Sequence, residues 1–136
     1  MRALAAVLLL ALSGAALADT TVSSKGLFQP SSYRIATSAE AVGFLDAVVV
    51  ALKSNPDAWL RLEVHADERP GALDNTVLAD KRAKVLVKEL RKRGISKKRI
   101  GSDAVGHSGV QPSPATNRIV FDFSDDAVVA VPPSWK

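Results

Sequence analysis

An acid and a base, Asp67 and Arg82, stand fifteen positions apart near the middle of the chain. Asp67 closes a run in which apolar and polar residues alternate, and Arg82 lies in the helical pattern that follows. A short acid at a strand end and a long base on the next helix can approach the same point. A carboxylate and a guanidinium held in this way suit a zwitterionic ligand, although the two groups could also simply pair with each other.

The element that positions Asp67 is predicted to be a strand over residues 59–66. Leu60, Leu62, Val64 and Ala66 alternate with more polar neighbours, which is typical of a sheet with one buried face. Loops rather than packed helices occupy the carboxyl end of such a strand, so we expect the ligand crevice there.

The element that positions Arg82 is predicted to be a helix that begins at a cap on Asp74 or Asn75 and ends at Arg93, before Gly94. On a helical wheel Arg82 lies at the edge of the apolar stripe, and Asn75 lies at a similar angle two turns earlier. Arg82 is therefore the mid-helix base directed toward the sheet. The stripe itself comprises Ala79, Ala83, Leu86 and Leu90.

The remaining pattern predicts the order β-α-β-α-β-β. A short strand over residues 33–36 leads to a helix that Thr37 and Glu40 would cap together and that Asn55 and Pro56 end. Two further strands follow the second helix, over residues 100–106 and 117–123. Right-handed crossovers then give an α/β fold, an α+β two-layer sandwich in which two helices cover one face of a mixed four-stranded sheet.

The chain divides into four expected segments. Residues 1–18 have one basic residue, a short apolar run and a small-residue ending, which are typical of a secretory signal peptide. A flexible leader over residues 19–32 follows, then the domain over residues 33–123 and a C-terminal tail over residues 124–136. The AVVAVPP stretch of the tail could add an edge strand or hang free.

Composition limits the class of protein. Removing eighteen of the 136 residues leaves 118, enough for one modest core, and no transmembrane segment is expected in the mature chain. The absence of cysteine excludes a lipid attachment site, disulfides and thiolate chemistry. Ten of the eighteen Lys and Arg residues lie between Lys81 and Arg99; this run mainly solvates a helix face and complements its dipole.

Most of the mature chain resembles the OmpA-like peptidoglycan-binding domain, the type found in OmpA, Pal and MotB. The resemblance rests on Asp67, Asn75, Leu78, Arg82, Ala83, Leu86 and Leu90, then on GIS before Lys97, RI at residues 99 and 100, Gly106, and NR at Asn117 and Arg118. It implies that Asp67 takes the side-chain ammonium of diaminopimelate in the peptidoglycan stem peptide and that Arg82 takes the adjacent carboxylate. Asn75 and Arg118 would support the site.

The chain departs from the family pattern in the residues around these two charges. Ala66 stands where the family usually has Thr, and Ala79 stands where it usually has Ser. The last strand reads Arg118, Ile119, Val120 instead of Arg-Arg-Val. The first change removes a hydroxyl that helps to orient the loop.

Other kinds of site find less support in the sequence. His65, Asp67 and His107 suggest zinc ligands, but His107 falls in a separate loop and no fourth ligand is evident, so we expect no metal and no cofactor. The basic run lacks the interleaved aromatics of a single-strand binder, so no nucleic acid is expected. Without a nucleophile elbow or a separated carboxylate pair, we expect no enzyme.

The sequence thus predicts a non-catalytic, peptidoglycan-binding module in the periplasm of a Gram-negative bacterium, where it would associate with the cell wall or the outer membrane. The alternative keeps the fold without wall binding and makes the chain a protein-interaction module with a partner in the cell envelope. The first hypothesis needs Asp67 and Arg82 to converge over an open notch. It also predicts that replacing either residue with Ala leaves thermal stability nearly unchanged.

Overall fold

The structure is a computed structural model that describes residues 19–110, 113 and 115–135. Four strands form one sheet in the order β1-β4-β2-β3. Strands β2 and β3 are parallel, and β4 runs antiparallel to both of its neighbours, β1 and β2. The strands are β1 (Asp19–Ser23), β2 (Leu60–Ala66), β3 (Ile100–Gly106) and β4 (Arg118–Phe123).

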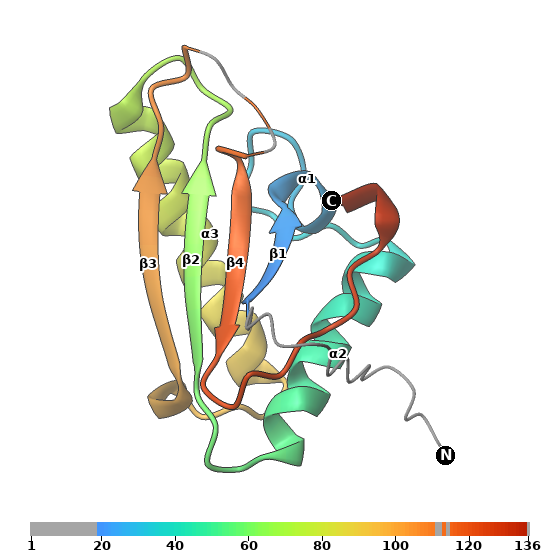
Figure 1. The fold of residues 1–136 in the computed structure, drawn as a ribbon. Helices are drawn as coiled ribbons and strands as arrows, with labels where there is room; N and C mark the ends of the chain where they lie inside the picture. Colours follow the sequence, from blue (N-terminus) through green and yellow to red (C-terminus); the bar gives the residue numbers. More distant parts are fainter. Residues whose placement is uncertain (1–18, 111–112, 114, 136) are drawn as a thin grey trace.

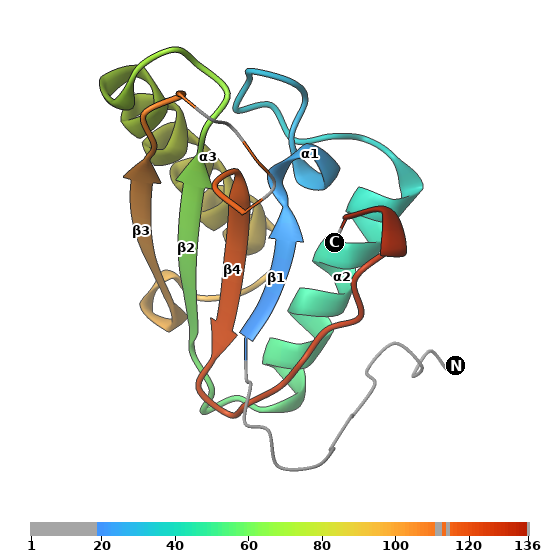
Figure 2. The ribbon, with the colours of Figure 1, turned by 45° about the horizontal axis from the view of Figure 1, so that its top comes forward.

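Two long helices, α2 (Ala39–Ser54) and α3 (Ala72–Lys92), lie on the same face of this sheet (Figure 1). The short helix α1 (Ser24–Leu27) follows β1 directly, and Figure 2 shows it at the end of the sheet where β2 and β3 also finish. The predicted two-layer fold, with a mixed four-stranded sheet and two helices on one face, is confirmed. Among the described residues, no helix combines the length and apolar character needed to cross a bilayer.

The core forms where the alternating strand meets the helices. Leu60, Leu62, Val64 and Ala66 of β2 are all fully buried, as their alternation predicted. Helix α2 begins one position later than expected, because the Ser38 hydroxyl, and not that of Thr37, accepts a hydrogen bond from the Ala41 amide at 3.1 Å. Its end at Asn55 agrees with the prediction.

The segment expected to be a flexible leader is structured. Residues 19–23 form the edge strand β1, whose Val22 is buried, whereas the strand predicted at residues 33–36 is reduced to a single bridge between Phe28 and Ile35. An edge strand is held mainly by backbone hydrogen bonds to its neighbour, here β4, so its polar composition gave little indication of it. The predicted signal peptide, residues 1–18, lies outside the described residues.

The described part of the C-terminal tail, residues 124–135, neither pairs as a strand nor hangs free. The Val129 amide donates to the Thr20 hydroxyl at 3.1 Å, and both residues are buried. Trp135 lies 5.4 Å from Phe44 between ring centroids and covers Gly26, where an added Cβ would come 2.2 Å from the indole. The tail therefore completes the core between α1 and α2.

Candidate functional site

Asn75 organises the loop that carries the predicted site. It is fully buried, and its Oδ1 accepts from the amides of Glu68 at 3.0 Å and Arg69 at 2.9 Å. Its Nδ2 donates to the carbonyls of Arg69 and His107, both at 2.8 Å. Asn75 is thus not the helix cap that the sequence suggested; α3 begins at Ala72, and Asn75 ties the loops after β2 and β3 to its first turn.

Asp67 follows β2 directly and is only 3% exposed. Its amide donates to Asn117 Oδ1 at 3.3 Å, and its Oδ2 accepts from the Thr116 hydroxyl. Its other oxygen, Oδ1, is buried and has no hydrogen-bond partner among the described residues. Because buried polar atoms are nearly always paired, this oxygen is an unused acceptor.

Arg82 is completely buried on the sheet side of α3. Its Nε donates to the Ser32 carbonyl at 2.8 Å, and its guanidinium carbon lies 5.0 Å from the centroid of the Phe28 ring. Its Nη1 lies 2.7 Å from Glu68 Oε2, which makes an ion pair. Apart from this ion pair, neither Nη1 nor Nη2 has a hydrogen-bond partner among the described residues.

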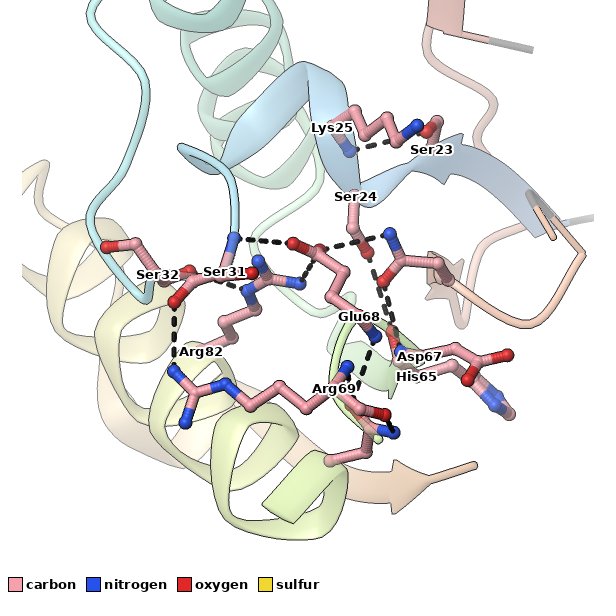
Figure 3. A network of polar contacts seen from close by, with 12 residues as sticks. Ser23, Ser24, Lys25, Ser31, Ser32, His65, Asp67, Glu68, Arg69 and Arg82 are labelled. Carbon is pink, nitrogen blue, oxygen red and sulfur yellow. Dashed lines mark hydrogen bonds and ion pairs between the residues drawn. The ribbon is translucent and has the colours of Figure 1, made fainter. Parts of the chain in front are cut away.

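Glu68, and not Asp67, is the acid that meets Arg82 (Figure 3). Its Oε1 accepts from the Ser31 amide at 2.6 Å, and its Oε2 accepts from Asn117 Nδ2 at 3.0 Å. Burial by itself raises the pKa of this carboxyl, but the contacts with Arg82, Ser31 and Asn117 outweigh that effect and leave its pKa lowered. Glu68 is therefore held in its charged form.

A cavity of about 380 Å³ opens beside these carboxylates. Asp67 and Glu68 line it together with the exposed Lys25 and four smaller polar residues, Ser23, Ser31, Ser113 and Asn117. Arg82 is not in this lining, because Glu68 lies against its guanidinium. The expectation that Asp67 and Arg82 converge over one open notch is therefore wrong as stated: the acid faces the cavity, and the base is sealed behind a second acid.

Arg118 lies apart from this cavity. It lines another cavity, of about 320 Å³, on the sheet face that carries no helix, together with Thr21, Arg61, Glu63, Val120 and Asp122. Its Nη1 donates to the Ala115 carbonyl, just before Thr116. Arg118 thus anchors the backbone that brings Thr116 to Asp67, and it does not face the Asp67 cavity.

His65 and His107 lie closer than the sequence suggested. Although His107 comes from the loop after β3, its Nε2 is 2.9 Å from His65 Nδ1, and His65 Nε2 is 2.8 Å from Glu63 Oε1. The hydrogen bond from His65 is the main reason why the pKa of Glu63 is lowered. Within the described residues, no group of three or more metal-binding side chains is arranged around an ion position.

Sequence reasoning missed three members of the site: Glu68, Thr116 and Lys25. Glu68 is adjacent to Asp67, but two neighbouring carboxylates in a loop do not reveal which one faces the helix arginine. Thr116 and Lys25 come from segments distant in the chain, and only the sheet brings them to Asp67. The Thr116 hydroxyl donates to the carboxylate of Asp67, the residue that follows Ala66.

The model of one protein family, described as the OmpA family, matches residues 27–120, which include Asp67, Glu68 and Arg82. The chain belongs to the OmpA family. Its fold is similar to that of the periplasmic domain of Helicobacter pylori MotB, with a TM-score of 0.63 and 17% identity, over 78% of this chain and 81% of that one. No curated protein matches the chain.

Two other solved structures give the same picture of this OmpA-family fold. The peptidoglycan-associated lipoprotein of Burkholderia pseudomallei has a TM-score of 0.57 and 22% identity, with 76% of this chain and 89% of that chain covered. The OmpA-like domain of FopA1 from Francisella tularensis has a TM-score of 0.58 and 15% identity, over 74% and 68% of the two chains. At these identities the similarity establishes the fold.

Proposed function

We propose that this OmpA-family protein is a non-catalytic module that binds peptidoglycan in the periplasm. The observation that carries the proposal is Asp67 Oδ1, a buried carboxylate oxygen that has no hydrogen-bond partner among the described residues and lies beside a cavity of about 380 Å³. A buried carboxylate oxygen of this kind is well satisfied by an ammonium group from a ligand. The family match and the similarity to a peptidoglycan-associated lipoprotein support the wall as the source of that ammonium.

The ligand within the wall is proposed to be the diaminopimelate of the stem peptide. Asp67 takes its side-chain ammonium, and Arg82 takes the adjacent carboxylate once Glu68 has moved aside. Asn75 positions the Asp67 loop through its four hydrogen bonds, and Arg118 anchors the backbone before Thr116. A single small, solvated site binds its ligand weakly. The wall offers many equivalent stem peptides, and this repetition would retain the protein on it.

Pull-down on purified sacculi tests this proposal. Asp67→Asn keeps the shape of the side chain but removes its charge, and we expect it to abolish co-sedimentation. Asp103→Asn is the matched control, because Asp103 is an exposed carboxylate on β3 that pairs with Arg61 and lies outside the cavity lining. Sedimentation of Asp67→Asn at the level of the parent would refute the site.

Sacculi that carry lysine in place of diaminopimelate test the identity of the ligand. Lysine has the side-chain ammonium but lacks the second carboxylate, so it should satisfy Asp67 and leave Arg82 with Glu68. We expect weaker binding to these walls than to diaminopimelate walls. Equal binding to both would mean that Arg82 plays no part in recognition.

A second function is favoured by the Glu68–Arg82 pair itself. Glu68 already neutralises Arg82, so a ligand would need no carboxylate. A cationic side chain from an envelope protein could then bind in the same cavity. In that case the chain is a protein-interaction module, and free diaminopimelate would cause no amide shifts around Asp67 and Asn75 in an NMR titration. Shifts at these residues support wall binding instead.

A further inference from the structure

Glu68 stands between the cavity and the buried arginine. Its side chain is 12% exposed and lines the cavity, whereas the side chain of Arg82 is fully buried behind it. The two Glu68 oxygens are held by the Ser31 amide, by Asn117 Nδ2 and by the guanidinium of Arg82. Figure 3 shows the contacts with Ser31 and Arg82 meeting at the Glu68 carboxylate.

The Glu68 carboxylate contacts Arg82 in the way that a ligand carboxylate would, but the fit is incomplete. Nη1 and Nη2 of Arg82 have no hydrogen-bond partner in the described part of the chain. Glu68 therefore neutralises the charge of the guanidinium but does not satisfy its hydrogen-bond donors. A guanidinium is best matched by two parallel hydrogen bonds to one carboxylate. Glu68 reaches it with a single oxygen, so a carboxylate that bound the guanidinium with both oxygens would match it better.

We propose that Glu68 is a specificity-determining residue that occupies the place of the ligand carboxylate at Arg82. A ligand with only an ammonium meets Asp67 and leaves Glu68 in place. A ligand that carries a correctly spaced carboxylate exchanges it for that of Glu68, and the charge around Arg82 is conserved. This inference rests on the proposed function for the identity of the ligand, but the exchange of one carboxylate for another does not depend on it.

Chemical rescue tests the exchange without any wall ligand. Glu68→Ala removes the internal carboxylate and leaves space beside Arg82, so the melting temperature should fall, and acetate should restore part of it relative to chloride at equal ionic strength. The control is Glu63→Ala, which removes a carboxylate that pairs with His65 on the same strand. Rescue of Glu68→Ala alone supports the proposal, and equal effects of acetate and chloride on it overturn the proposal. Should Glu68→Ala not fold, Glu68→Ser, which also removes the carboxylate and leaves space beside Arg82, is used with the same comparison.

Titration with free meso-diaminopimelate compares the affinities of the parent and of Glu68→Ala for this ligand, and so measures the effect of Glu68 on specificity. Because the parent binds the carboxylate only in the minor state with Glu68 displaced, Glu68→Ala should bind on the order of tenfold more tightly, and lysine should gain much less. Equal diaminopimelate affinity in parent and variant would overturn the role of Glu68. If neither protein binds diaminopimelate while acetate still rescues the variant, the proposed function fails and the exchange at Arg82 stands.

Discussion

Glu68 and Arg82 form a buried ion pair, with Oε2 and Nη1 2.7 Å apart, next to Asp67, whose buried Oδ1 has no hydrogen-bond partner among the described residues. This relationship changes what mutation of Arg82 is expected to do. The sequence predicted an arginine that faces an open notch and whose replacement would leave thermal stability nearly unchanged. The structure has a fully buried one, and breaking a buried pair leaves an uncompensated charge.

Arg82→Ala should therefore destabilise the fold, by about 3 to 5 kcal/mol, the typical cost of breaking a buried pair from one side. Urea unfolding followed by circular dichroism measures this change. The control is Lys84→Ala on the same helix, because Lys84 is exposed and forms a surface ion pair with Asp80; it should change stability by less than about 0.5 kcal/mol. A small effect of Arg82→Ala would show that Arg82 is accessible in solution.

Asn75→Ala should loosen the binding loop. The change removes the hydrogen bonds that Asn75 makes with two amides and two carbonyls near the base of the loop. We expect a loss of about 2 to 4 kcal/mol, since each buried unpaired group costs about 1 to 3 kcal/mol and water re-satisfies some of them. Faster hydrogen exchange at Glu68 and Arg69 would locate the effect, and Thr76→Ala, at an exposed neighbouring position, should not show it.

Acid should weaken the fold through Glu68. Its pKa is lowered in the folded protein from an ordinary value of 4.5, so its contribution is present above pH 4.5 and is lost as the pH falls below that value through the folded pKa. Unfolding free energies measured between about pH 3 and pH 7 should fall at the acid end in the parent. Glu68→Gln should show a smaller fall, and parallel profiles would exclude Glu68 as a source of the acid sensitivity.

The two tryptophans should respond differently to replacement. Trp135 is buried against Phe44 and Gly26, whereas Trp59 is half exposed. Trp135→Ala should cost about 3 to 5 kcal/mol, the range for a large buried aromatic, and should release the tail from α1. Trp59→Ala should cost much less in the same thermal unfolding experiment, and similar losses from both would mean that the tail is not docked in solution.

Local sequence patterns determined most of the architecture. The alternation along β2 decided which residues point inward, and the bounds of β3 matched the prediction because strand and turn signals agreed there. The polar edge strand β1 and the tail ending at Trp135 were not predicted. Both are held by contacts with segments that are distant in the sequence, β4 and the α1–α2 region. The local pattern of apolar and polar residues does not indicate such contacts.

The candidate site was also only partly predictable from the sequence. The spacing of Asp67 and Arg82 in the sequence determined that an acid and a base would lie at one end of the sheet, on a strand end and on the helix that follows. Only the tertiary structure decided which acid meets the base, because Ser31 and Asn117, from two other segments, draw Glu68 over Arg82 and leave Asp67 facing the cavity. Side-chain pairing depends on packing in three dimensions, which the order of residues along a strand and a helix does not fix.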